Sequence, residues 1–186
     1  MHLSLLFLCA WATAAAWAQP KEWAVDRGQS QIIYRGYHPA HSWTGTSRDV
    51  RGAVWFDPER PGLTRVRIWA PVESFSSDND NRDSNMLLVV EADRYPEVRF
   101  ESDSVAILTW DGQRGQWRVS GRLQFHGQSR PISALVDVLR TAEGLYAKGG
   151  FRILLSHFGV RRPRLLLLPI RDELDIRFEI LVRRPA

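Results

Sequence analysis

Four of the five histidines are the side chains of this chain best suited to acid–base or metal chemistry. His38 and His41 form the run His-Pro-Ala-His, while His126 and His157 lie much further along the sequence. Imidazole is a frequent zinc ligand and general base. Pro39 within the run and the missing third ligand argue against a metal site, unless His126 or His157 converges on the pair. We predict no metal and no catalytic residue, and we keep a histidine-centred hydrolase or metal-dependent enzyme as the alternative.

Nucleophilic catalysis has little support in the sequence. Ser129, Ser133 and Ser156 all lack the Gly-x-Ser-x-Gly setting of a nucleophile elbow. The single cysteine, Cys9, lies in an amino-terminal apolar run, so the remaining chain has no residue for a disulfide or a catalytic thiolate. These features favour a binding protein without a cofactor over an enzyme.

Two charged motifs are better explained by a structural role or by contact with a surface than by catalysis. Arg82-Asp83 opens a helical pattern, where aspartate suits the helix dipole and arginine can hold loop carbonyls. Arg161, Arg162 and Arg164 precede Leu165 to Leu168. This basic segment could touch anionic lipid headgroups transiently during ligand loading. Alternatively, it is a solvated turn before the buried start of the last strand.

The amino terminus predicts export. A compact apolar run from Leu3 to Ala10 is followed by small residues and by Ala16-Trp17-Ala18, which resembles a signal-peptidase site. We expect a signal peptide over 1–18, a single domain over 19–186 and a periplasmic location. The formal net charge of +4, spread over mixed signs, does not indicate nucleic-acid binding.

The elements that must position these residues are mainly strands. Apolar and polar residues alternate with period two through most of the chain, which is typical of half-buried strands. One helical pattern interrupts them from Arg82, with Asp80 and Asn81 as candidate caps and Tyr95-Pro96 as its end. The expected strands cover about 29–38, 50–56, 63–74, 98–110, 117–125, 132–138, 145–155 and 170–182.

Eight antiparallel strands with one apolar face can close on themselves and remove exposed edges. We therefore predict an all-β fold, a lipocalin-like eight-stranded antiparallel β-barrel with a short helical insertion. Small residues on the inward faces would leave volume for a ligand, although glycines can equally mark strand bends. The small inward residues are Gly36, Gly52, Ala70, Gly121, Ala134, Ala147 and Gly149.

A set of inward apolar and aromatic residues could line a tunnel for a long hydrocarbon, although core packing would explain the same pattern. His38, on the apolar side of its strand, either bonds to a neighbour or meets a polar group of the ligand. The predicted ligand-binding residues are Ile32, Tyr34, His38, Val66, Ile68, Met86, Phe100, Leu123, Phe125, Phe151, Ile176 and Phe178.

A series of short motifs in a shared order resembles the YceI-like family of bacterial periplasmic proteins. Two runs depart from the usual pattern, namely His41-Ser42-Trp43-Thr44-Gly45 and Ser156-His157. The matching motifs are Trp23-x-x-Asp26, Tyr34 with His38, Gly52 before Phe56-Asp57, Arg82-Asp83, Tyr95-Pro96-x-x-x-Phe100, Gly121-x-Leu123-x-x-x-Gly127, Phe158-Gly159-Val160 and Asp172-Glu173-Leu174.

This resemblance implies an apolar lipid inside the barrel, namely a polyisoprenoid, a quinone or a fatty amide-like molecule, and no chemistry performed on it. The alternation pattern alone favours core packing as the role of the inward apolar residues. The resemblance favours ligand binding instead. It also implies a membrane b-type cytochrome as a second kind of partner, for which outward Trp55 and Trp69 would form a contact patch. A monomer or a homodimer is expected.

Overall fold

The computed structural model describes residues 20–165 and 168–185, which form antiparallel strands, one α-helix and four short 3₁₀ helices. The predicted signal peptide lies outside the described residues. No helix within the described part of the chain is long and apolar enough to cross a membrane. The elements are β1 (Lys21–Ala24), η1 (Arg27–Gln29), β2 (Gln31–His38), β3 (His41–Ser47), β4 (Arg51–Phe56), η2 (Pro61–Leu63), β5 (Arg65–Pro71), η3 (Val72–Ser74), α1 (Asp80–Val89), β6 (Glu97–Trp110), β7 (Arg114–Phe125), β8 (Gln128–Arg140), β9 (Gly144–Leu154), η4 (Leu155–Phe158), β10 (Arg164–Leu165), β11 (Leu168–Pro169) and β12 (Glu173–Arg183).

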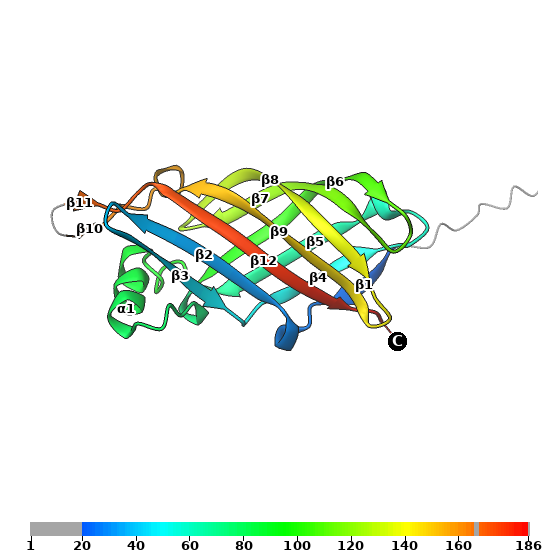
Figure 1. The fold of residues 1–186 in the computed structure, drawn as a ribbon, viewed down its shortest axis with the longest axis horizontal. Helices are drawn as coiled ribbons and strands as arrows, with labels where there is room; N and C mark the ends of the chain where they lie inside the picture. Colours follow the sequence, from blue (N-terminus) through cyan, green and yellow to red (C-terminus); the bar gives the residue numbers. More distant parts are fainter. Residues whose placement is uncertain (1–19, 166–167, 186) are drawn as a thin grey trace, which may run out of the picture.

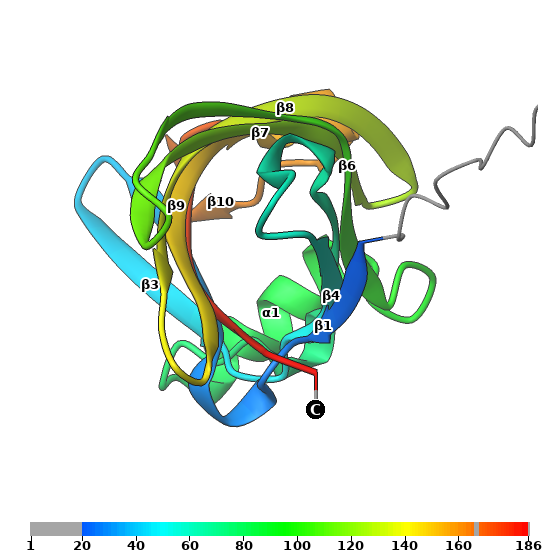
Figure 2. The same cartoon turned by 90° about the vertical axis from the view of Figure 1, so that its right-hand side faces the viewer.

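The main sheet is strongly curled and entirely antiparallel. Its ten strands follow the order β1-β4-β5-β6-β7-β8-β9-β12-β2-β3. Val25, directly after β1, forms a bridge with Val182 of β12, which brings opposite parts of the sheet together. Viewed along their length, the strands surround a central axis with α1 at the far end (Figure 2). The all-β class and the helical insertion are therefore confirmed, in a barrel-like sheet.

The predicted number of eight strands is wrong. The main sheet also contains β1 and β3, and β10 pairs with β11 in a separate two-stranded sheet. The strands expected from the sequence leave out β3, which contains few apolar residues. However, its Trp43, Thr44 and Thr46 favour extended backbone. The two residues Pro39 and Ala40 join β2 to β3 in a tight hairpin, with His38 opposite His41.

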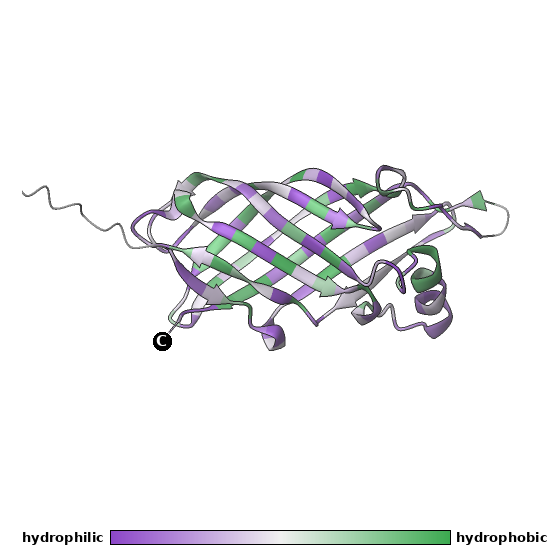
Figure 3. Ribbon diagram, turned by 180° about the vertical axis from the view of Figure 1, so that it is seen from behind, coloured by the Kyte–Doolittle hydropathy of each residue, from purple (hydrophilic) through white to green (hydrophobic). Residues whose placement is uncertain are grey.

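Alternation along the strands separates a packed inner face from a solvated outer face. In β7, Trp117, Val119 and Leu123 are buried, while Arg118 and Arg122 are exposed. Figure 3 shows this alternation as bands of hydrophobic and hydrophilic residues along the strands. Successive side chains of a strand point to opposite faces of the sheet. In this sheet only the inner of the two faces is buried.

An aromatic cluster fills the interior near β1 and the carboxyl end of β12. Phe56 packs edge-on against Trp23 at 5.3 Å between ring centroids and lies 5.9 Å from Trp117. Trp117 also contacts Trp110 at 5.3 Å. A second buried cluster, around Leu155 of η4, packs near the opposite end, against residues that include Val89 of α1.

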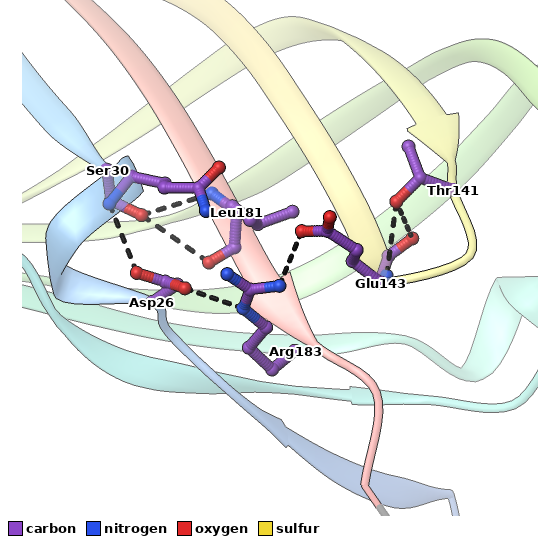
Figure 4. A network of polar contacts seen from close by, with 8 residues as sticks. Asp26, Ser30, Thr141, Glu143, Leu181 and Arg183 are labelled. Carbon is purple, nitrogen blue, oxygen red and sulfur yellow. Dashed lines mark hydrogen bonds and ion pairs between the residues drawn. The ribbon is translucent and has the colours of Figure 1, made fainter.

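A polar network ties β12 to the segment that follows β1 (Figure 4). Arg183 Nε donates to Asp26 Oδ2 at 2.6 Å, and its other nitrogens reach Glu143. The backbone N–H of Leu181 donates to Ser30 Oγ at 3.1 Å. The hydrogen bond from Arg183 lowers the pKa of Asp26, so this carboxylate stays charged and holds the sheet closed at this point.

The helical insertion α1 lies at the end of the sheet near the β2–β3 hairpin and β10 (Figure 1). Its N-cap is Asn79, whose side chain accepts a hydrogen bond from the N–H of Arg82, and not Asp80 or Asn81 as predicted. The helix also ends earlier than predicted, at Val89, because Glu91 adopts a left-handed backbone with φ of 50°. Tyr95-Pro96 instead leads into β6.

Candidate ligand-binding cavity

A cavity of about 750 Å³ lies inside the curled sheet, with a predominantly apolar lining. Eleven of the twelve predicted residues line it, from six strands and from α1. Their contact with a ligand stays a prediction, but their convergence on one space is now a structural fact. These residues are Ile32, Tyr34, Val66, Ile68, Met86, Phe100, Leu123, Phe125, Phe151, Ile176 and Phe178.

The cavity extends from the aromatic cluster to the end of the sheet that carries α1. Trp117, Val138 and Val182 line its inner part, next to the packed aromatic rings. Met86 of α1 and Arg164 of β10 line its other end. An elongated apolar space of this kind fits a chain-shaped molecule better than a compact one.

His38 is the predicted ligand residue that the geometry separates from the cavity. Its ring is 4 % exposed, and its Nδ1 accepts a hydrogen bond from the N–H of Ala40 at 3.3 Å. Among the described residues that line the cavity, His41 is present and His38 is absent. Of the two roles open to His38, the structure supports bonding to a neighbour.

The segment from His41 to Gly45 contributes to the cavity although sequence reasoning treated it only as an unusual loop. It forms most of β3, and His41 and Trp43 both line the cavity. The rings of His41 and Trp43 lie 5.8 Å apart, which adds a partly polar aromatic surface to the mainly apolar lining. The signal that could have revealed this strand is the alternation of His41, Trp43 and Gly45 on one face.

The small inward residues have two different roles. Ala134 and Ala147 line the cavity and leave it open, as predicted. Gly36 and Gly149 instead make room for aromatic rings of the protein itself, and Gly149 also for the backbone carbonyl of Leu135. A Cβ on Gly36 would lie 2.5 Å from the Trp43 ring, and one on Gly149 would lie 2.8 Å from the Phe178 ring.

Gly52 marks a bend in its strand, which is the alternative explanation given for the inward glycines. It has a φ of 134°, and a Cβ there would lie 2.0 Å from the carbonyl oxygen of Arg67. Ala70 is fully buried and packs in the wall, outside the cavity lining of the described residues.

The histidines are distributed over separate contacts. The His38 and His41 rings lie 5.4 Å apart, whereas His126 Nδ1 donates to the carbonyl oxygen of Phe158 at 2.8 Å. Within residues 20–165 and 168–185, no three His, Cys, Asp or Glu side chains are grouped closely enough to hold a metal ion. Ser156, one of the candidate nucleophiles, bonds to Asp172. The convergence that the enzyme hypothesis requires is not seen among the described residues.

Tyr34 lines the cavity, while its hydroxyl is enclosed by neighbouring atoms of the protein. The residue is 9 % exposed, and its hydroxyl has no hydrogen-bond partner among the described residues. Burial and the nearby Asp83 carboxylate raise its pKa above the usual range. The Trp43 indole acts in the opposite direction and lowers the pKa.

Arg82-Asp83 anchors α1 to the wall of the cavity, which confirms the structural role predicted for the pair. Arg82 Nε donates to Ser77 Oγ, and its terminal nitrogen donates to the Ser77 carbonyl, both at 2.8 Å. Asp83 accepts from the N–H of Ser77 at 3.0 Å and from the hydroxyls of Ser76 and Ser77. Burial acts to raise the pKa of Asp83, but the hydrogen bonds from Ser77 and Ser76 outweigh it and lower the pKa.

The basic segment lies beside the cavity. Arg161, Arg162 and Arg164 are exposed, and Arg164 and Pro163 contribute to the lining. Arg162 donates to the carbonyl of Ile170 at 3.3 Å and lies 3.8 Å from Asp172. The run Leu165 to Leu168 falls partly outside the described residues, but Leu168 itself is 50 % exposed. The last strand begins only at Glu173, so the segment does not enter it directly.

Trp55 and Trp69 both carry arginines over their rings, and Trp69, which was expected to face outward, also contributes to the cavity lining. Arg65 and Arg67 lie over Trp55, each 5.8 Å from the ring centroid, and Arg99 lies over Trp69 at the same distance. Such stacking shields part of each indole. The proposed role of Trp55 and Trp69 in contacting a membrane cytochrome stays a prediction.

Solved structures with the same fold support this architecture. Burkholderia cenocepacia BcnA superposes with a TM-score of 0.75 at 20 % identity, covering 84 % of this chain and 98 % of that chain. A polyisoprenoid binding domain from Saccharophagus degradans superposes with a TM-score of 0.71 at 13 % identity, covering 88 % and 98 %. These likenesses show that the curled sheet is a shared fold.

Sequence comparison extends the likeness over nearly the whole chain. A UPF0312 protein of Azotobacter vinelandii is 23 % identical over 185 residues, covering 94 % of this chain and 93 % of the relative. A UPF0312 protein of Pseudomonas savastanoi is 26 % identical over 182 residues, covering 89 % of each. The family model of the YceI-like domain matches residues 23–182. The chain therefore belongs to the YceI-like domain family.

Proposed function

We propose that this protein is an exported carrier that holds one long-chain apolar lipid, such as a polyisoprenoid or a quinone, inside the curled sheet and performs no chemistry on it. The observation that carries the proposal is the elongated, mainly apolar cavity, lined by ten residues that strand alternation already placed on the inward face and by Met86 of α1. A binding domain with the same fold, from Saccharophagus degradans, is described as polyisoprenoid-binding, which supports the ligand class.

Apolar burial supplies enough free energy for such binding. Each buried methylene contributes about 0.8 kcal/mol, so ~15 of them give about 12 kcal/mol before association and chain-ordering costs. A lining made mainly of aliphatic and aromatic side chains provides this contact. The aromatic cluster of Trp23, Phe56 and Trp117 packs one end, so the ligand would enter from the end with α1 and β10.

The amino-terminal sequence supports a role outside the cytoplasm. The apolar run and Ala16-Trp17-Ala18 at the amino terminus favour a cleaved leader and a periplasmic location. A periplasmic protein that carries a water-insoluble molecule would exchange it with a membrane. The exposed Arg161, Arg162 and Arg164 next to the cavity suit contact with the anionic headgroups of that membrane.

Displacement of a fluorescent dye tests this function directly. The purified protein is loaded with N-phenyl-1-naphthylamine and titrated with squalene or with geranylgeraniol delivered from cyclodextrin. We expect both lipids to displace the dye with a stoichiometry of one per protein. If neither molecule displaced the dye, and if a short-chain ester or phosphoester were turned over instead, the carrier function would be wrong.

A further inference from the structure

His126 joins three segments at the end of the sheet that carries α1. It lies in the turn between β7 and β8, and its Nδ1 donates to the carbonyl oxygen of Phe158 in η4 at 2.8 Å. Its Nε2 lies 3.5 Å from Oε1 of Glu91, which belongs to the turn just after α1. The His126 side chain is only 10 % exposed, so the ring is buried at this junction.

The bond to Phe158 determines which nitrogen of the neutral ring carries the proton. A carbonyl oxygen can only accept, so the proton of a neutral His126 ring lies on Nδ1. Nε2 is then a bare acceptor, and it is buried without a hydrogen-bond partner among the described residues. The Glu91 carboxylate opposite it is also an acceptor. A neutral ring therefore places two acceptors against each other, which is unfavourable.

The other charged and titratable groups around the ring do not supply the missing proton. Tyr95 packs edge-on against the ring, with centroids 4.9 Å apart, and Arg94 Nη1 lies 3.7 Å from Glu91 Oε2. From β8, Arg130 donates to the backbone carbonyl of His157, which is itself exposed. Within the described part of the chain, it is a second proton on the ring that turns Nε2 into a donor toward Glu91.

This contact acts on the helix at the entry end of the cavity. Met86 of α1 lines the cavity, and the first turn of the helix is held by the bonds of Asp83 to Ser77. The pKa of Asp83 is lowered, so this first anchor does not change between pH 5 and pH 8. The anchor after the end of the helix involves an imidazole, the side chain whose charge ordinarily changes in that range.

We propose that His126 and Glu91 form a pH-dependent contact that holds α1 at the entry of the cavity when the ring is protonated and weakens when the ring is neutral. This inference rests on the proposed carrier function and adds control over how fast the ligand enters and leaves. A protonated ring donates from Nε2 to a carboxylate of opposite charge, which is a charge-assisted hydrogen bond. Acid should therefore slow ligand exchange.

Release of a dye at two pH values measures the contact. The protein is loaded with N-phenyl-1-naphthylamine and mixed rapidly with an excess of methyl-β-cyclodextrin, and the fall in fluorescence gives the dissociation rate. The wild type should release the dye about three- to tenfold more slowly at pH 5.5 than at pH 8, the factor expected for one net hydrogen bond. His157→Gln, which removes an exposed histidine from η4, should keep this pH dependence.

Two replacements of Glu91 should act in opposite directions. Glu91→Gln offers an amide N–H to Nε2 of the neutral ring, so it should release the dye at pH 8 as slowly as the wild type does at pH 5.5. Glu91→Ala removes the contact, so it should release the dye quickly at both pH values. Both replacements keep a Cβ at this left-handed position, where φ is 50°, so the backbone strain stays the same.

Two results would overturn the inference. One is a wild-type release rate that is equal at pH 5.5 and pH 8, and the other is a shift of the rate in the same direction by Glu91→Gln and Glu91→Ala. The carrier function would survive both results, because the dye would still bind and squalene would still displace it at equilibrium. A wild type that binds neither the dye nor squalene at either pH would contradict the carrier function, and the inference with it.

Discussion

Tyr34 and Gly45 face each other across β2 and β3, and the aromatic ring of the first occupies the space that a side chain on the second would need. A Cβ on Gly45 would lie 2.3 Å from Tyr34 Cε1 and 2.6 Å from its hydroxyl oxygen. The missing side chain of one residue therefore positions the polar group of the other, at the wall of the cavity.

Replacing Gly45 with alanine should displace the Tyr34 ring from its position over β3. We expect Gly45→Ala to lower the free energy of unfolding by about 1–3 kcal/mol, the usual cost of overpacking. Gly62→Ala is the matched control, because a Cβ there meets nothing within 4 Å. Thermal unfolding of both variants checks the prediction, and equal melting temperatures would show that the ring moves without cost.

Filling the cavity should block binding without unfolding the sheet. Ala134 lines the cavity, and Ala106 lies exposed on β6. We expect Ala134→Phe to weaken displacement of the dye by squalene on the order of tenfold or more, since 1.4 kcal/mol of lost contact already gives that factor. Ala106→Phe should bind as the wild type does. Unchanged binding by Ala134→Phe would place the ligand outside this cavity.

The anchor of α1 should weaken in acid. The folded-state pKa of Asp83 is lowered by its bonds to Ser77 and Ser76, so the stabilisation it provides is fully present above its unfolded pKa of about 4. That stabilisation is lost as the pH falls below this value toward the folded-state pKa. Asp83→Asn should cost about 1–3 kcal/mol at neutral pH and should flatten the acid dependence below about pH 4.

Denaturant unfolding at pH 7, 4 and 3 measures this effect. Asp103→Asn serves as the control for loss of a carboxylate, because the Asp103 side chain is 63 % exposed and lies 4.0 Å from Arg122. If Asp83→Asn and Asp103→Asn lost stability in parallel with pH, the anchor would not depend on the Asp83 charge.

The basic segment beside the cavity should control contact with anionic membranes. Each arginine near such a surface contributes about 1 kcal/mol, so replacing Arg161, Arg162 and Arg164 by glutamine should weaken partition on the order of a hundredfold. Sedimentation with phosphatidylglycerol vesicles at low salt provides the measurement.

The matched control replaces three exposed arginines of β7, Arg114, Arg118 and Arg122, which changes the net charge by the same amount. If both triple variants lost vesicle binding equally, net charge alone would explain the attraction, and the segment would have no special part in loading.

Period-two alternation predicted the cavity lining well because it reports which face of a strand each side chain occupies. Phe151 of β9 and Phe178 of β12, for example, belong to neighbouring paired strands, and both line the cavity. In β3, the alternation of His41, Trp43 and Gly45 is too short and too weakly apolar to distinguish this strand from a loop. Sequence reasoning consequently chose His38 over His41, which the hairpin places on the lining.

Properties that depend on contacts between distant segments were not accessible from the sequence. The role of Gly36 depends on Trp43 lying opposite it, which only the hairpin register establishes. The unpartnered state of the Tyr34 hydroxyl depends on every residue packed around it. The prediction of Asn81 or Asp80 as helix cap failed because three adjacent Asx residues can all cap, and local geometry selects Asn79.

Native mass spectrometry of the protein as it leaves the cell tests the central claim most directly. The full chain with its leader is expressed in a Gram-negative host and recovered from the periplasm without detergent, and the bound material is then extracted into organic solvent and identified. The carrier function predicts one long-chain lipid per protein. A protein recovered from the periplasm with an empty cavity, and unable to take up squalene afterwards, would contradict the account.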